Sequence, residues 1–204
     1  SAADGASETT VTVDLTAQAE GAFLMAPQFD VAVSSNLAES YGYDDQVTDG
    51  VSALDVAVKA HELIFGEAYT PETKDDFFTV SSSGMVSKQF GDETYSTGFY
   101  VNNMYPHDGT LVDPNNPQSG YNGYLINQCP VKDGDLVELF NYISDFYMDT
   151  YTWMLVDGAY TRDITVEANT DLAVTVEGFW PISSSACEDL EALIAMGQPC
   201  EGLH

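Results

Sequence analysis

The residues whose types and spacing could do chemistry gather between positions 102 and 123. This stretch holds three prolines, three glycines and five asparagines, and it is too long for an ordinary connection inside a compact domain. Three tyrosines and a histidine lie in or beside it, namely Tyr105, Tyr121, Tyr124 and His107. A tyrosine ring offers apolar area and a hydroxyl together, which suits a sugar or a peptide. We expect a ligand-binding site here, with a surface loop that binds nothing as the alternative.

The same stretch offers oxygen ligands for a cation. Asp108, Asp113 and Asn115 carry the carboxylate and amide oxygens that Ca²⁺ prefers. The spacing does not match an EF-hand, because Pro117 stands where a further ligand belongs and no glutamate follows at the required distance. Solvated loop acids are therefore the favoured interpretation, with a calcium site on these three residues as the alternative. No cofactor is expected to be required.

Catalytic signatures are missing from the sequence. It has no G-x-S-x-G, no H-E-x-x-H, no glycine-rich phosphate loop and no C-x-x-C. Carboxylates are so numerous that pairing any two as a glycosidase dyad carries no information. His61 has no second histidine or cysteine at metal spacing, so we expect a packed or hydrogen-bonded side chain. The chain is predicted not to be an enzyme, and a hydrolase is the alternative.

The chain has three cysteines, of which two lie close together in the segment CEDLEALIAMGQPC. In an oxidising compartment Cys187 and Cys200 are predicted to form a disulfide, worth about 3 kcal/mol for a loop of this length. Cys129 is left over. We expect it to be a small buried hydrophobic residue.

The composition excludes two classes of partner. Five Lys and Arg against 33 Asp and Glu give a net charge of -28, and such a surface repels phosphate backbones and anionic lipid headgroups. Nucleic acid and peripheral membrane binding are therefore not expected. The chain also has no apolar run of 18 residues or more, so we expect no membrane insertion by this segment. Because 44% of the residues are hydrophobic, a folded core is expected.

The helix and the first two strands are marked by local patterns. Strands are predicted in TVTVDLTAQ, by its period-2 alternation, and in FDVAVSS, with Phe29, Val31 and Val33 on one face. A helix is predicted in VSALDVAVKAHELIFG, starting at a Ser52–Asp55 capping box and stopping at a glycine. Its Leu54, Val58 and Phe65 stripe should pack on a mixed or antiparallel sheet that includes the strands near 11–15 and 136–140.

Further strands are predicted in FFTVSSSGMVSKQFG, TGFYVNN, GYLINQCPV, DLVELFNYIS, TYTWMLVDG, DITVEAN and LAVTVEGFW, with a hairpin turn at Asp133-Gly134. Two strands, one helix and then many strands is the order of an α+β fold. The acidic stretch 144–150 marks a boundary. We therefore expect a flexible leader over 1–10, a domain over 11–145, and a β-rich, small sandwich-like extension over 146–204.

Several ordered motifs resemble a known family. The run YGYDDQ…VSALDVAVKAHELIFGEAYT, then SSGMVSKQFG, FYVNNMYPHDG and VKDGDLVELFNY, resembles the transcobalamin C-terminal-like domain of Gram-positive bacterial surface proteins over about residues 10–145. The resemblance implies a β-grasp-like core with one main helix, an exported context and no known catalysis. This chain has Asn102-Asn103 where the family usually has Asn-Gly, and asparagine tolerates the positive φ of that turn.

The resemblance implies an extracellular, cell-surface or secreted module beside neighbouring domains of a longer protein. We expect it to bind a glycan or protein ligand through loops, or to act as a spacer. Vertebrate relatives of the family use this domain to cover cobalamin, so a small-molecule, corrinoid-binding domain is the alternative. No residue-level cobalamin signature carries over to this chain.

Overall fold

The computed structural model describes residues 7–44, 47, 49–94, 96–143 and 151–179. Over these residues the fold is α+β, as the element order predicts, with one main helix and several small sheets. The largest sheet, called the central sheet here, has five strands. They are β1 (Thr10–Ala19), β2 (Ala22–Phe23), β3 (Gln28–Ser34), β8 (Thr97–Val101) and β12 (Leu136–Asn141). Because β1 runs parallel to β12 and the other pairs are antiparallel, the sheet is mixed.

Helix α2 (Ala53–Phe65) begins and ends where the sequence predicts. The Ser52 hydroxyl accepts the Asp55 N–H at 3.1 Å, and the Asp55 carboxylate accepts the Ser52 N–H at 2.9 Å. This reciprocal pair is a capping box, which satisfies donors that the first turn leaves free. Gly66 ends the helix with φ 54°, a left-handed value that glycine adopts without strain.

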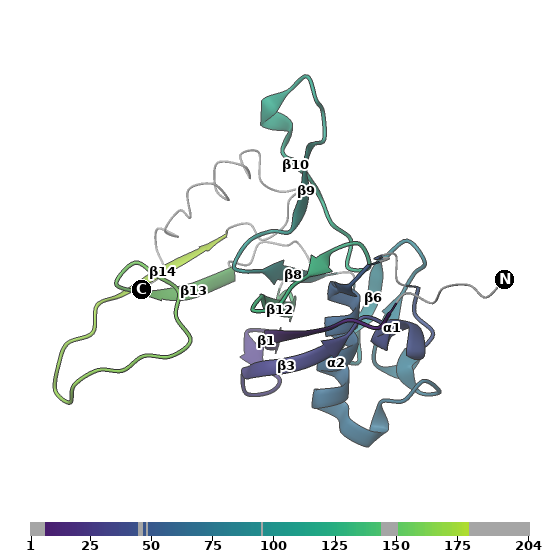
Figure 1. The fold of residues 1–204 in the computed structure, drawn as a ribbon, viewed down its shortest axis with the longest axis horizontal. Coiled ribbons are helices and arrows are strands. Elements are labelled where there is room, and N and C mark those ends of the chain that lie inside the picture. The colour runs from purple at the N-terminus through teal and green to yellow at the C-terminus, as the bar shows by residue number, and fades with distance from the viewer. Residues whose placement is uncertain (1–6, 45–46, 48, 95, 144–150, 180–204) are drawn as a thin grey trace.

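The main core lies between α2 and one face of the central sheet (Figure 1). Leu54 and Val58 are fully buried there, and Phe65 is partly buried against the same cluster. The alternating residues of β1 and β12 point to the helix because side chains on a strand alternate between faces. The sheet side of this core includes Val11, Val13, Leu15, Val137 and Leu139. The predicted packing of the helix stripe is confirmed.

His61 is buried in this core and holds α2 to the turn that follows β6 (Val86–Gln89). Its Nε2 accepts the Phe90 N–H at 3.0 Å, so its Nδ1 carries the proton and donates to the Ala57 carbonyl at 2.8 Å. The imidazole stacks on Phe78 with ring centroids 4.5 Å apart. Burial lowers the pKa of His61 to about 4. The prediction of a packed, hydrogen-bonded histidine is confirmed.

Short elements surround this core. A three-stranded sheet joins β5 (Thr79–Val80), β6 and β7 (Asp92–Glu93), and β4 (Val51–Ser52) pairs with β11 (Pro130–Val131). Helix α1 (Leu37–Ser40) precedes α2, and two 3₁₀ turns, η1 (Gly66–Ala68) and η2 (Lys74–Asp76), follow it. In the described part of the chain, no helix has the length and apolar character needed to cross a membrane.

Two predicted strands are wrong. Residues 124–129 form a turn, because Ile126 and Cys129 pack into the core from it and the Cys129 carbonyl accepts the first N–H of α2. Residues 163–169 form no strand, because Ile164 and Val166 lie exposed and no described neighbour pairs with this segment.

The extension is simpler than predicted over its described residues, 151–179. Its described residues contain a single two-stranded sheet of β13 (Tyr151–Val156) and β14 (Val174–Phe179), which packs against the central sheet through Tyr151 and Trp153 rather than against a second sheet of its own. A sandwich needs two sheets that share an apolar interior. Met154 and Val174 are instead exposed.

Asp133-Gly134 makes a turn but not the predicted hairpin. Gly134 has φ 82° and the Asp135 N–H bonds to the Lys132 carbonyl at 3.1 Å. The strand before the turn, β11, pairs with β4, whereas the strand after it, β12, inserts between β1 and β8. The flanking apolar runs therefore bury themselves against different partners, which local sequence does not reveal.

Phe29 leaves the face that the alternation assigns to it. Asp30 has φ 60°, and the β1–β3 register shifts between Val13 and Leu15, which marks a bulge. A bulge inserts an extra residue and breaks the in–out alternation. Val33 is fully buried while Phe29 is 49% exposed.

Candidate functional site

Residues 102–124 form a projecting hairpin, which we call the β9–β10 hairpin. It consists of β9 (His107–Leu111), β10 (Tyr121–Gly123) and the 3₁₀ turn η3 (Pro117–Ser119). Figure 1 shows it rising away from the central sheet and α2. The sequence predicts an irregular loop here, but the segment has a short sheet of its own.

The base of the hairpin is fixed to the central sheet. Asn102 and Asn103 have φ 56° and 57°, so the predicted Asn-Asn turn with left-handed backbone is confirmed. The Asn102 side chain accepts the Leu136 N–H and donates to Asp135, both at 2.9 Å. These bonds tie the start of the hairpin to the start of β12.

Three of the predicted ligand-binding residues lie together. The rings of His107 and Tyr121 stack with centroids 4.3 Å apart and an interplanar angle of 11°, and both side chains are half-buried. Tyr105 packs over Gly123, where an added Cβ would lie 2.2 Å from the tyrosine hydroxyl. Tyr124 packs instead against the main core. The hairpin therefore offers the stacked His107–Tyr121 pair as an aromatic patch, and Tyr124 is not part of it. Tyr105 lies beside the pair at Gly123, which is the cross-strand partner of His107, and also packs against the cluster of Tyr100, Phe140 and Tyr151.

The three candidate calcium ligands are hydrogen-bonded within two separate turns. Asp108 accepts the Thr110 hydroxyl at 2.6 Å and the Thr110 N–H at 2.8 Å, and these bonds lower the pKa of Asp108. Asp113 accepts the N–H of Asn115 at 2.9 Å, near the far end of the hairpin. Each carboxylate is thus engaged in its own turn, and no group of three His, Cys, Asp or Glu residues able to hold a metal exists among the described residues.

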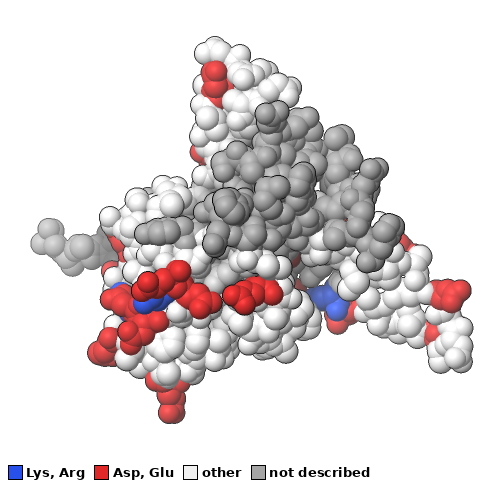
Figure 2. All heavy atoms as spheres, turned by 180° about the vertical axis from the view of Figure 1, so that it is seen from behind, with Lys and Arg blue, Asp and Glu red and all other residues white. Residues whose placement is uncertain are grey.

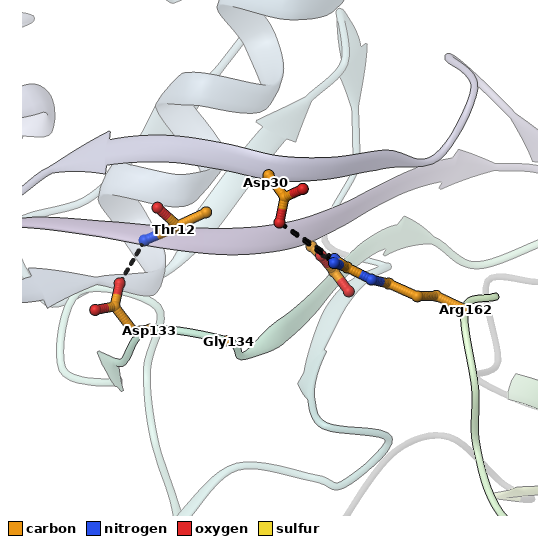
Figure 3. Close-up of a pocket in the computed structure, with 6 residues that line it drawn as sticks. Thr12, Asp30, Asp133, Gly134 and Arg162 are labelled. Atoms are coloured by element: carbon orange, nitrogen blue, oxygen red, sulfur yellow. Dashed lines mark hydrogen bonds and ion pairs between the residues drawn. The ribbon is translucent and has the colours of Figure 1, made fainter.

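A polar pocket of about 540 Å³ opens where the loop after β13 meets the central sheet. As Figure 3 shows, Arg162 reaches from that loop toward β1 and β3. Its guanidinium pairs with Asp14 and lies 3.3 Å from Asp30. It also lies 5.4 Å from the centroid of the exposed Phe29 ring. No local sequence pattern marks these residues, although Arg162 is one of only five lysine and arginine residues.

A buried polar cluster around Glu138 lies on the face of the central sheet opposite α2. Glu138 is only 4% exposed and pairs in register with Thr16 on β1 and Tyr100 on β8. The Tyr151 hydroxyl and the Asn103 backbone N–H donate to its carboxyl group. The Asn103 side-chain amide lies 2.6 Å from Oε1 of Glu138, where its nitrogen can donate to the carboxylate or, turned over, its oxygen can accept from the protonated carboxyl group.

Burial dominates the chemistry of this carboxyl group. It raises the pKa of Glu138 to about 8, against the opposing effect of the hydrogen bonds from Tyr151 and Asn103. Burial also raises the pKa of Tyr151. Sequence reasoning missed Glu138, although a signal was present: a lone acid inside the apolar run LVELF of a predicted strand implies burial on both faces.

Charge is distributed unevenly over the surface. Figure 2 shows acidic side chains clustered on the body, while the projecting hairpin is almost free of charge apart from its tip. Residues 102–124 include two acids, Asp108 and Asp113, and no lysine or arginine. The hairpin therefore carries little charge for its length in a strongly acidic chain.

Comparisons with known proteins identify no relative. No family model matches the chain, and no curated protein or solved structure matches it significantly. The likeness to transcobalamin C-terminal-like domains thus rests on the sequence motifs alone.

Of the three cysteines, Cys129 lies within the described residues. Cys129 is buried and free, as expected, and burial raises the pKa of its thiol to about 12. A thiol with so high a pKa forms little of the reactive thiolate at neutral pH. Cys187 and Cys200 lie outside the described residues, so their pairing stays a prediction.

Proposed function

We propose that this chain is an extracellular, non-catalytic binding module that contacts a glycan, or else a protein ligand, through the β9–β10 hairpin. The single observation that carries the proposal is the aromatic patch of His107 and Tyr121 on that hairpin, with Tyr105 beside it. The extracellular setting, and a β-grasp-like arrangement of α2 on the central sheet, follow from the motif resemblance.

The make-up of the hairpin favours a carbohydrate. Stacked aromatic rings give a flat apolar surface on which a sugar ring can lie, and tyrosine adds a hydroxyl for orientation. The same hairpin carries Asn115, Asn116, Gln118 and Asn122, which supply uncharged donors and acceptors. Because the hairpin is ordered and tied at its base, binding would cost little further conformational entropy.

A glycan and peptide array, followed by titration of the best hit, tests the proposal. Two variants should stay folded and lose at least tenfold in affinity. In the first, an Asn-Gly turn replaces the hairpin, and the second is the double variant His107→Ala/Tyr121→Ala. Phe23→Ala removes an exposed aromatic side chain outside the hairpin and should bind as the parent does.

Unchanged binding by the shortened chain would refute the site. Binding of peptides but no glycan would assign the hairpin to a protein ligand. If the parent protein binds nothing on either array, only the spacer role remains. No observation supports the corrinoid alternative, because the pocket described above is polar and is lined by three aspartates.

A further inference from the structure

The β13–β14 hairpin covers part of the face of the central sheet opposite α2. Tyr151 of β13 sits on it in a second apolar cluster with Tyr100 and Phe140, and its ring lies 5.0 Å and 4.7 Å from theirs. Trp153 packs against the same cluster. The β13–β14 hairpin therefore packs on this face through Tyr151 and Trp153.

Polar contacts join the cover to the sheet as well. The Gln18 amide of β1 donates to the Tyr151 hydroxyl at 3.3 Å, and that hydroxyl donates to Glu138. Arg162, in the loop between β13 and β14, pairs with Asp14 of β1 and Asp30 of β3. The carboxyl group of Glu138 is thus buried beneath the β13–β14 hairpin.

We propose that the β13–β14 hairpin is a proton-gated cover, held on the central sheet while Glu138 is protonated and released when that carboxyl group ionises. A buried charge without a basic partner is costly, and the groups that hydrogen-bond Glu138 are neutral. Removal of the cover would return the carboxylate to water. The docked state thus favours the protonated form.

The other ionisable groups around Glu138 do not neutralise it. Tyr100 on β8, Tyr151 on β13 and Tyr160 in the loop between β13 and β14 are uncharged. Asp14 on β1 has the same charge as an ionised Glu138, and Arg162, in the same loop as Tyr160, is already paired with Asp14 and Asp30.

The sign of the effect follows from the raised pKa. The exposed carboxyl group loses its proton above its ordinary pKa of 4.5, whereas the covered one keeps it up to about 8. Docking is therefore strongest near pH 5 and weakens as the pH rises toward 8. Each unit of difference in pKa corresponds to a tenfold change, so docking should weaken a few hundredfold over this range.

Hydrogen exchange measured from about pH 5 to pH 8, corrected for the intrinsic rate of exchange, tests the proposal. In the parent, protection of the β13 and β14 amides should fall a few hundredfold while protection of α2 stays constant. Glu138→Gln, which keeps shape and lacks the titration, should abolish the fall. Glu177→Gln, the matched control on the same hairpin, should retain it.

A second measurement and a second variant test the proposal even if Glu138→Gln does not fold. In a Trp180→Phe background Trp153 is the sole tryptophan, because the chain has two, and its emission should shift red as the pH rises. Tyr151→Phe removes a hydrogen bond that favours the ionised form, so it should move the transition to higher pH. Flat protection in the parent, an unchanged fall in Glu138→Gln, or equal loss in α2 would each overturn the proposal.

Discussion

At the scale of single residues, two buried side chains make stability depend on pH in opposite directions. The folded state keeps His61 neutral and Glu138 protonated, because burial lowers the pKa of the first to about 4 and raises that of the second to about 8. Unfolding frees both groups to titrate near their ordinary values. Acid therefore weakens the α2 core through His61, whereas base weakens the opposite face through Glu138.

The acid limb of this dependence can be isolated in a Glu138→Gln background. As the pH falls below 6.5, the unfolded chain protonates His61 and the folded chain does not, so stability should drop by about 2 kcal/mol between pH 7 and pH 4.5. Urea unfolding at several pH values measures this drop. His61→Phe should flatten it, and His107→Gln, which alters a histidine on the β9–β10 hairpin outside this core, should not. A drop that survives His61→Phe would contradict the assignment.

At the scale of elements, Asp55 does more than complete a capping box. Its carboxylate also accepts the Ala38 N–H at 2.8 Å, which joins the start of α2 to α1. Asp55 is fully buried, so each donor that it satisfies would otherwise be left without a partner in the core. One side chain thus sets both the start of the helix and the position of its neighbour.

Replacing Asp55 should therefore cost more than replacing the cap itself. Asp55→Ala leaves two buried N–H groups unsatisfied and should cost about 3 kcal/mol in the free energy of unfolding. Ser52→Ala should cost about 1 kcal/mol, and Ser40→Ala on the exposed side of α1 should change little. Chemical denaturation of the three variants makes the comparison. Equal costs for Asp55→Ala and Ser52→Ala would argue against the link to α1.

The predicted Cys187–Cys200 disulfide also concerns a single segment of the chain, CEDLEALIAMGQPC. If protein made in an oxidising compartment is denatured without reductant and alkylated, only Cys129 should be modified, as counted by intact mass. Cys187→Ala should free Cys200 and give two modified thiols. It should also lower stability by about 3 kcal/mol. Three modified thiols in the parent would refute the pairing.

At the scale of the whole molecule, charge sets the balance between solubility and self-repulsion. The net charge is -28, and the described ion pairs involve just four of the basic residues, Lys59, Lys74, Lys88 and Arg162. Surface pairs of this kind contribute little. Repulsion among the acids, which the folded state brings close together, should dominate the response to salt.

Added salt should therefore stabilise the fold. Raising NaCl from about 10 mM to about 500 mM shortens the Debye length severalfold and should add about 1 kcal/mol, or about 3 °C in Tm. Choline chloride should act alike if the effect is screening. A rise with CaCl₂ at far lower ionic strength would point to a specific calcium site instead, and a fall in Tm with NaCl would contradict the repulsion.

The sequence by itself determined the features that depend on near neighbours. The Ser52–Asp55 box, the stop at Gly66, the left-handed Asn102-Asn103 turn and the inward residues of β1 all rest on contacts or periodicities within a few residues, so they can be read along the chain. The α+β class followed from the order of such elements.

Only the tertiary structure decided what depends on distant partners. It separated the strands on either side of Asp133-Gly134, turned Phe29 outward at a bulge, and placed Arg162 beside Asp14, 148 residues away. It also drew Tyr105, His107 and Tyr121 together while leaving Asp108 and Asp113 apart. The burial of Glu138 belongs here as well, because a strand pattern shows the face of a side chain but not what covers that face.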